Sequence, residues 1–383
     1  MNPLRIHLQM VGMAILWGAS WPWGRVVAQA MPTFVASAMR FLFAIIPLLI
    51  WLYAANRFTY AKKLRPNQWF GLFLTALLGI FGYSTFFIWG LKYVPAGQGT
   101  MVVASNPVFT MFFAILLFKE KWNRWVVLGM AIAVSGSLLA MTKGNPANLL
   151  QHFGFGQMLL LCALVCWVAY TLLARKVLTG IDSLTATTIS STFGFFMLAL
   201  AAICTEDAEG WASVLQLNGA QWFSLLGLAF GATVLAYAWY FDGVKYLGAG
   251  NAAAYIIIVP ILGILFSAMW LHEPLDASLL LGGLLAVSGL GIMHWGHAIT
   301  MKICLVKTSS MGDIIHTLPA LTDAAQALKD FSVDWVVEEN FAEIPRWHFA
   351  VDKVIPIALR RWRKKPCATE TRHQWQNYRK LLQ

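Results

Sequence analysis

The sequence has few charged residues. Asp, Glu, Lys and Arg make up 12% of its 383 residues, whereas a soluble domain usually has about 25%. The shortage lies in residues 1–300, which contain 8 acidic and 15 basic residues, against 9 and 13 in the much shorter stretch 301–383. Because hydrophobic residues make up 59% of the chain, the composition predicts a long membrane part followed by a short soluble part.

The sequence also lacks the motifs of several function classes. It has no Gly-rich phosphate loop, which argues against transport driven by ATP, and no acidic relay of the kind that proton pumps use. Its basic residues are not interleaved with aromatic residues in the pattern of a nucleic-acid reader. We therefore expect no nucleic-acid partner, and the excess of basic residues in both parts indicates anionic lipid or anionic ligands instead.

Cysteine is scarce, with five residues. Cys162 and Cys166 are one helical turn apart in an apolar segment, and no His or carboxylate lies near them at ligand spacing. We expect no disulfide framework, no metal site and no cofactor, and we assign these thiols to packing in the membrane core. The first apolar run is too long, and lacks the small-residue cleavage site, for a signal peptide.

Ten segments are long and apolar enough to cross a membrane. A helix needs about 20 apolar residues to cross about 30 Å of hydrocarbon, and the small residues in many of these segments let helices pack closely. The predicted fold is an all-α membrane protein. The segments are 8–28, 33–54, 68–91, 96–118, 124–142, 154–174, 185–204, 219–244, 249–271 and 277–297.

The distribution of Lys and Arg predicts the orientation of these segments. Basic residues gather in the loops 56–67 and 119–124 and at Arg175 and Lys176, whereas the loop 205–218 is acidic. Because short cytoplasmic loops are enriched in Lys and Arg, the even-numbered loops and both termini are expected in the cytoplasm. The expected partners are a small-molecule substrate and the lipid bilayer, and the sequence is also compatible with a homodimer.

The two halves of the membrane part repeat each other. Residues 92–136 align with 245–289 at a constant offset of 153, with about a dozen identities in 45 positions. Pro107 matches Pro260, and Glu120 matches Glu273. Five spans in each half make the two copies enter the membrane from opposite sides, which is the inverted repeat that many secondary transporters place around one central site.

At these residues the chain resembles the drug/metabolite transporter superfamily, in particular its EamA-like exporters. The segments that carry the resemblance include "ILWGASWPWGRVVAQAMP", "AMRFLFA" and the ends of both halves, "NPVFTMFFAILLFKEKWNRWVVLGMAIAVSGSLL" and "VPILGILFSAMWLHEPLDASLLLGGLLAVSGLGI". The resemblance covers 1–298. It implies two five-helix repeats, 1–145 and 146–298, and export of metabolites, amino acids or drugs across the bacterial inner membrane by alternating access.

Arg40 is the charge that a loop explains least, because it lies well inside the second span. A charge there usually faces protein or a water-filled cavity, so Arg40 either anchors an anionic substrate, reaches back to the outer interface, or pins helix ends. Arg25, near the end of the first span, is expected to reach the interface. The predicted substrate-binding residues, most of them aromatic, are Trp17, Arg40, Tyr83, Trp167, Tyr170, Tyr237 and Tyr240.

The matched pairs Glu120/Glu273 and Pro107/Pro260 are the candidates for gating. Each Glu precedes a helix, where a carboxylate stabilises unpaired N–H groups, and the alternative is proton coupling or gating at opposite faces of the membrane. Each Pro lies inside a span and removes one N–H. The alternatives for the prolines are a bend that shapes a cavity and plain packing.

The last part of the chain predicts a small α/β domain. "KICLVK" and "VDWVVEE" are strand patterns, residues 313–328 predict a helix interrupted or kinked at Pro319, and 352–357 indicate a third strand. This order is typical of a parallel α/β domain. The basic cluster "RRWRKK" at 360–365 suits either phosphate groups or anionic lipid headgroups.

"MKICLVKTSSMGDIIHTLPALTDAAQAL" and the stretch that follows resemble the N-terminal lobe of lipopolysaccharide heptosyltransferase I over residues 301–365. The resemblance implies a catalytic base at Asp313, a site for the phosphorylated acceptor at Arg360, Arg361, Arg363 and Lys364, and transfer of heptose from ADP-heptose to Kdo-lipid A. It also implies a Rossmann-like GT-B fold with two lobes. Residues 299–383 correspond only to a truncated first lobe, so we expect the membrane-tethered transferase, the alternative function, to be inactive. Met301 resembles an ordinary start residue, which suggests two joined reading frames.

Overall fold

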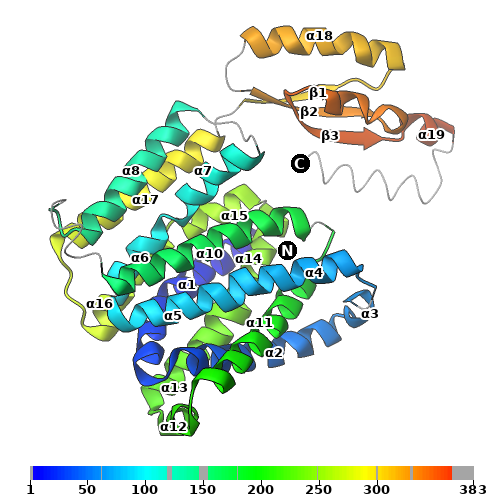
Figure 1. Ribbon diagram of the computed structural model, residues 1–383. Coiled ribbons are helices and arrows are strands. Elements are labelled where there is room, and N and C mark those ends of the chain that lie inside the picture. Colours follow the sequence, from blue (N-terminus) through cyan, green and yellow to red (C-terminus); the bar gives the residue numbers. More distant parts are fainter. Residues whose placement is uncertain are drawn as a thin grey trace. The chain divides into compact units, whose positions relative to one another are not determined.

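The computed structural model describes residues 3–61, 63–118, 123–145, 154–178, 180–247, 249–298, 301–327 and 331–364. They form two compact units, Met1–Gly296 and His297–Gln383. Figure 1 shows the first unit as a bundle of helices and the second as a small sheet with helices beside it.

The first unit is entirely helical among the described residues. Short helices connect the long ones: α3 (Phe58–Ala61), α12 (Ala208–Ala212) and a 3-10 turn, η3 (Ser213–Gln216). The other α-helices are α1 (Pro3–Ala30), α2 (Thr33–Ala54), α4 (Pro66–Ala76), α5 (Tyr83–Tyr93), α6 (Ala96–Ala104), α7 (Asn106–Phe118), α8 (Arg124–Met141), α10 (Phe155–Val177), α11 (Ser183–Thr205), α13 (Gly219–Leu226), α14 (Ala236–Leu247), α15 (Ala249–Ile256), α16 (Val259–Leu271) and α17 (Ala277–Ala298).

Nine helices in the described part of the chain are long and apolar enough to cross a membrane, and they correspond to the second to tenth predicted spans. The first predicted span lies in α1, a helix of 28 residues that does not belong to these nine. α1 packs against α16, α14 and α5 inside the unit, and Met10, Met13 and Val27 are fully buried. A multi-pass membrane protein is therefore confirmed, and the first of the ten predicted spans stays a prediction.

The third and eighth spans each contain a π-helical turn. η1 (Leu77–Gly82) joins α4 to α5, and η4 (Gly227–Leu235) joins α13 to α14. At η1, a Cβ on Gly79 would lie 2.6 Å from the Tyr170 ring, so only glycine allows α10 this close. Adding the repeat offset of 153 to the residue numbers of η1 gives 230–235, so η1 corresponds to the second part of η4. Because π turns rotate the side chains that follow them, both spans present different residues to their neighbours than a regular helix would.

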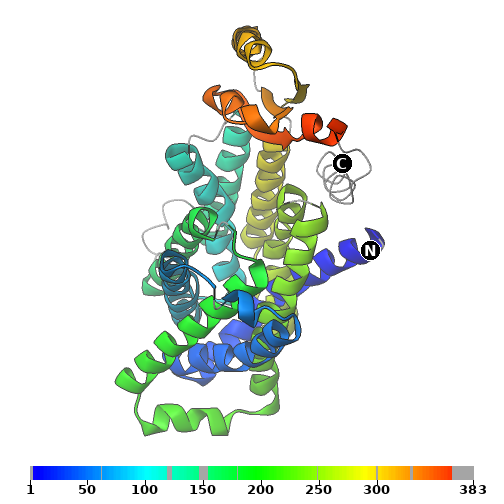
Figure 2. The ribbon, with the colours of Figure 1, turned by 90° about the vertical axis from the view of Figure 1, so that its right-hand side faces the viewer.

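The fourth and ninth spans are both broken. α6 ends at Ala104 and α7 starts at Asn106, while α15 ends at Ile256 and α16 starts at Val259. Each break lies just before a proline, Pro107 or Pro260, whose missing N–H cannot continue the helical hydrogen-bond ladder. Figure 1 labels α6 and α7, and α15 and α16, as separate helices, and Figure 2 shows the helical unit turned by 90°.

α8 and α17 run antiparallel with their backbones in contact. A Cβ on Gly136 would lie 2.6 Å from the Gly282 carbonyl oxygen, and a Cβ on Gly289 would lie 2.6 Å from the Gly129 carbonyl oxygen. The contact is reciprocal, because adding the repeat offset of 153 to residue numbers 129 and 136 gives 282 and 289, the glycines on the partner helix. In Figure 1 the two helices lie side by side, as this close approach requires.

The second unit is a parallel three-stranded sheet in the order β1-β2-β3. Its elements are β1 (Met301–Val306), α18 (Met311–Ala327), β2 (Phe331–Glu338), two 3-10 turns at Glu339–Phe341 and Ile344–Trp347, β3 (Val351–Ile357) and α19 (Leu359–Lys364). Alternate residues of β2 face opposite sides, so Val333, Trp335 and Val337 join the core that contains Ile314 of α18. The small parallel sheet predicted for this part is confirmed, and α18 continues through Pro319.

Candidate functional site

A cavity of about 320 Å³ lies inside the helical unit. It is lined by residues of α2, η1, α5, α10, α11, η4 and α14, so both halves of the unit contribute to it. The lining residues that carry aromatic, polar or charged side chains are Arg40, Phe41, Tyr83, Ser84, Trp167, Tyr170, Ser183, Thr187, Ser190, Ser191, Thr233, Tyr237 and Phe241.

Arg40 places a buried positive charge at this cavity. The residue is 8% exposed, and its Nε and Nη2 atoms donate hydrogen bonds of 3.2 and 3.1 Å to Thr233 Oγ1. The Thr233 hydroxyl in turn donates to the Leu228 carbonyl oxygen at 2.9 Å, inside η4. The guanidinium therefore links α2 to the π turn of the eighth span and does not reach the membrane interface. Pinning of helices and binding of an anion are both compatible with this position.

Aromatic residues surround the cavity. The Tyr83 and Trp167 rings lie 4.9 Å apart, and Trp167 and Tyr170 lie 5.4 Å apart, measured between ring centroids. Arg40, Tyr83, Trp167, Tyr170 and Tyr237, five of the seven predicted substrate-binding residues, line the same cavity.

The other two predicted residues do not line the cavity. Trp17 lies behind Tyr237, with ring centroids 5.4 Å apart, and 5.5 Å from the ring of Tyr240. Its indole N–H donates to the Ala232 carbonyl oxygen at 3.1 Å. Trp17 and Tyr240 therefore support the wall that Tyr237 forms.

Hydroxyl groups from α11 complete the lining, and none of them is among the predicted substrate-binding residues. Ser190 Oγ lies 3.1 Å from Thr75 Oγ1, whereas the buried Ser191 Oγ has no hydrogen-bond partner among the described residues. The density of Ser and Thr in "SLTATTISST" (183–192) was the available signal, because such side chains in a span point to helix contacts or to a polar cavity.

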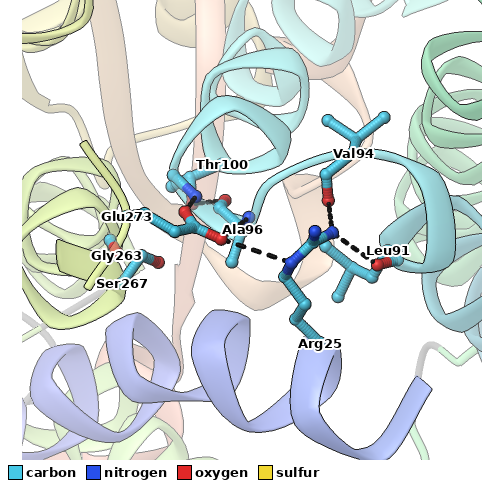
Figure 3. Close-up of polar contacts among 9 residues, drawn as sticks. Arg25, Leu91, Val94, Ala96, Thr100, Gly263, Ser267 and Glu273 are labelled. Atoms are coloured by element: carbon cyan, nitrogen blue, oxygen red, sulfur yellow. Dashed lines mark hydrogen bonds and ion pairs between the residues drawn. The ribbon is translucent and has the colours of Figure 1, made fainter. Parts of the chain in front are cut away.

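Glu273 binds the start of α6 at one end of the bundle. Its two carboxylate oxygens accept hydrogen bonds from the backbone N–H groups of Ala96 and Gly97, at 2.8 and 2.9 Å. These are the first two residues of α6, where the N–H groups lack partners in the helix and the helix dipole is positive. Figure 3 shows the Glu273 side chain between α6 and Arg25.

Arg25, on α1, binds Glu273 and the end of α5 at the same end of the bundle. Its Nε atom lies 3.3 Å from Glu273 Oε1, and Nη1 donates to the carbonyl oxygens of Leu91, at 2.9 Å, and Val94. Both side chains are largely buried, with 19% and 13% of their surfaces exposed. We call these two side chains, with the backbone groups that they bind at Leu91, Val94, Ala96 and Gly97, the clamp.

The clamp differs from what the sequence suggested. Arg25 turns inward to the end of α5 instead of reaching the interface, because two free carbonyl groups and a carboxylate lie within its reach. Glu273 stabilises the start of α6, which is 177 residues away in the sequence, and not the start of the helix that follows it. Glu120 lies outside the described residues. Pro107 and Pro260 are not among the residues that line the cavity.

The cavity extends away from the clamp. α10 begins beside the clamp, where the Phe155 ring lies 5.5 Å from the ring of Tyr93. From there it runs about 34 Å for its 23 residues. The lining continues to Ala174 near the far end of α10, and then to Leu178 and Ile181 beyond it. The cavity therefore reaches the end of the bundle opposite the clamp.

In the second unit, Asp313 is part of a helix cap. Its Oδ2 atom accepts hydrogen bonds from the Ser310 hydroxyl at 2.9 Å and from the Ser310 backbone N–H at 3.2 Å, at the start of α18. These hydrogen bonds, first of all the one from the hydroxyl, hold the pKa of Asp313 below its usual value. A lowered pKa makes this carboxylate a weaker proton acceptor than an ordinary Asp.

The basic residues after β3 lie against acidic and backbone groups. Arg361 Nη2 lies 3.1 Å from Glu339 Oε2, and Arg360 Nη2 donates to the Ser309 carbonyl oxygen at 3.5 Å. Arg363 is exposed, and the Lys364 side chain lies outside the described residues. Asp313 and Arg360 thus lie at the same edge of the sheet, on either side of the 309–310 turn. The residues that the structure describes include no group of three or more His, Cys, Asp and Glu able to hold a metal ion.

Comparison with known proteins gives two kinds of similarity. The model of the family described as "EamA-like transporter family" matches residues 4–142 and 154–295. The uncharacterized transporter YyaM of Bacillus subtilis is 25% identical over 291 residues, which is 76% of this chain and 93% of YyaM. A solved crystal structure with 19% identity covers 74% of this chain and 95% of its own, with a TM-score of 0.52, and so shows the same fold.

The second similarity is to lipopolysaccharide heptosyltransferase 1. The protein of that name from Pseudomonas aeruginosa is 58% identical over 82 residues, which is 21% of this chain and 23% of that protein. The Escherichia coli K12 protein is 55% identical over 83 residues and 26% of its length. This chain therefore spans about a quarter of the length of these relatives. Both resemblances inferred from the sequence are confirmed.

Proposed function

Since the chain belongs to the EamA-like transporter family, we propose that it exports small metabolites, amino acids or drugs by alternating access through the cavity beside Arg40. In this proposal the chain lies in the bacterial inner membrane with ten spans, in two inverted five-helix repeats, and both termini are cytoplasmic.

The reciprocal geometry of the two halves supports the inverted repeat. The antiparallel contact between α8 and α17 exchanges its members when 153 is added to or subtracted from the residue numbers. The breaks at Ser105 and Ile258 are related by the same offset, and the π turns overlap under it. Such pairs are what two copies related by a two-fold axis in the membrane plane would contain.

The observation that carries the transport proposal is a cavity whose lining draws on both halves and extends to the end of the bundle opposite the clamp. The clamp lies across one end, while the lining reaches Leu178 and Ile181 at the opposite end. Arg175 and Lys176 lie at that opposite end, and the excess of basic residues there favours a cytoplasmic location for it. In this proposal the structure is the inward-facing state, and release to the other side requires the clamp to open.

We expect Arg40→Ala to lower transport at least about tenfold, because a buried group that binds solute contributes several kcal/mol, and about 1.4 kcal/mol is a factor of ten. The measurement is uptake of radiolabelled phenylalanine, 3-phenylpropanoate and ethidium by inside-out vesicles that contain the full chain. Arg57→Ala, at an exposed loop position, is the control and should leave uptake unchanged. A version that ends at Ala298 should also retain uptake. Uptake of no probe above empty vesicles, or equal uptake by the Arg40 and Arg57 variants, would contradict the proposal.

We also propose that residues 301–364 do not transfer heptose in this chain. The match spans about a quarter of the similar enzymes, and Asp313 is engaged in the cap of α18. Membranes that contain the full chain, given ADP-heptose and Kdo-lipid A, should form no more product than membranes without it. Asp313→Ala should change nothing in this assay. Product that forms with the native chain and is lost in Asp313→Ala would establish the transferase function instead.

A further inference from the structure

We propose that the solute of this cavity is a monocarboxylate with an apolar body of about one ring, whose carboxylate binds Arg40. The inference names the substrate class of the proposed transport site and rests on that proposal. It draws on the charge of the lining, the free donors of Arg40, the aromatic walls and the volume.

The lining carries a single formal charge. Among the described residues that line the cavity, Arg40 is the one cation, and no Asp, Glu, Lys or His is present. The hydrogen-bond partner of Arg40 is the neutral Thr233 hydroxyl, and its guanidinium carbon lies 5.3 Å from the Phe41 ring centroid. A buried cation without a counter-ion is unfavourable. One negative charge on the solute balances it, whereas a phosphate dianion would leave an excess charge in the same cavity.

Arg40 has donors left for such an anion. A guanidinium has five N–H groups, and the two hydrogen bonds from Nε and Nη2 end on one oxygen atom, Thr233 Oγ1. No described residue accepts a hydrogen bond from Nη1. A carboxylate can take two parallel N–H groups from a guanidinium, so the unused edge of Arg40 matches a carboxylate in shape as well as in charge.

The rest of the cavity suits an apolar ring. Tyr83, Trp167, Tyr170 and Tyr237 form its walls, and aromatic side chains favour flat, apolar partners in offset or edge-to-face arrangements. The volume of about 320 Å³ lies at the lower end of the range of about 300–1,000 Å³ for small-molecule pockets. The space therefore suits a body of about one ring with a short chain.

The lining disfavours a zwitterion of the same shape. An ammonium group in this cavity would be repelled by the Arg40 guanidinium, and the described lining contains no acidic side chain to offset that repulsion. The free hydroxyl of Ser191 can donate to a second oxygen or accept from a neutral polar substituent. An amino acid is therefore expected to bind more weakly than the acid that lacks its amino group.

The test is the affinity of the purified full chain for three matched probes, measured by calorimetry. The probes are 3-phenylpropanoate, its neutral amide 3-phenylpropanamide and the zwitterion phenylalanine. We expect the carboxylate to bind at least about tenfold more tightly than either of the others. Arg40→Gln should lose this preference while its affinity for the amide stays unchanged, which also shows that the variant is folded. Arg57→Gln should behave as the native chain.

Several outcomes would overturn the inference. Equal affinities for the three probes in the native chain, no binding of the carboxylate, or a preference that survives in Arg40→Gln would each do so. If Arg40→Gln does not fold, Arg40→Lys decides: it keeps the charge and should keep the preference over the amide, although the carboxylate should bind more weakly. Binding without vesicle uptake would contradict the transport proposal alone, and uptake of phenylalanine or ethidium without binding of the carboxylate would contradict this inference alone.

Discussion

Glu273→Ala is expected to open the clamp and, under the proposed transport cycle, to expose the cavity from the end of the bundle where the clamp lies. The substitution removes the partner of two backbone N–H groups and of Arg25. Leaving buried polar groups unpaired costs about 1–3 kcal/mol for each group, and about 1.4 kcal/mol changes an equilibrium tenfold. The population with an open clamp should therefore rise at least about tenfold.

The measurement is the rate at which a membrane-impermeant thiol reagent modifies a cysteine in the cavity. The reporter is Ser191→Cys in a chain whose five native cysteines are replaced by serine, and the reagent is added outside intact cells. We expect the rate to rise at least about tenfold in Glu273→Ala. Glu273→Gln should give a smaller rise, because the amide oxygen still accepts one hydrogen bond but no longer carries a charge for Arg25.

Asp276→Ala is the matched control for this experiment. Asp276 lies three residues from Glu273. Its Oδ2 atom is 3.9 Å from Lys143 Nζ, and both side chains are about half exposed, so the two form a weak surface ion pair. Its removal should leave the modification rate unchanged. If the reporter cysteine is modified no faster in Glu273→Ala than in Asp276→Ala, the clamp does not control access to the cavity.

Gly289→Ala is expected to prevent normal assembly of the helical unit. A Cβ at position 289 would lie 2.3 Å from the Ala133 backbone nitrogen and 2.6 Å from the Gly129 carbonyl oxygen. Both atoms belong to the backbone of α8, so the helices have to move apart and lose packing along their length. Overpacking of this kind costs about 1–3 kcal/mol or more, against the slight gain that alanine normally brings to a helix.

The measurement is the melting temperature and the yield of monodisperse protein in detergent. We expect a lower melting temperature or a large loss of yield for Gly289→Ala, and the same for Gly136→Ala, whose Cβ would lie 2.5 Å from the Ala286 nitrogen. Gly291→Ala, two residues along the same helix, is the control, because nothing lies within 4 Å of its added Cβ. Equal melting of the Gly289 and Gly291 variants would show that the close backbone contact is not needed.

Much of the fold follows from the sequence, because apolar length and alternation are local properties. The second to tenth spans and the three strands of the second unit could be predicted in this way. The π turns at Leu77–Gly82 and Gly227–Leu235 could not, because an irregular turn leaves the apolar composition of a span unchanged. α1 shows the opposite limit: it is not among the nine helices that length and composition mark as membrane-spanning, although it packs inside the unit against α16, α14 and α5.

The candidate site was predictable in part, for a similar reason. Arg40 is conspicuous because a charge inside a span is rare, and aromatic residues near it are natural candidates for a cavity wall. The partners of Arg25 were not predictable from depth in the span alone, since the carbonyl groups at Leu91 and Val94 come close only in the folded bundle. The same holds for Glu273, whose hydrogen-bond donors at Ala96 and Gly97 come from the other half of the unit.

The backbone contact between α8 and α17 has a consequence for movement. Glycines at two levels hold each helix against the other's backbone, so neither helix can slide without first separating from its neighbour. In the proposed transport cycle these two helices would therefore be a static frame, and the change of access would occur elsewhere. The interruptions at Ser105 and at Ile257–Ile258 are the places about which α6 and α15 would then rock.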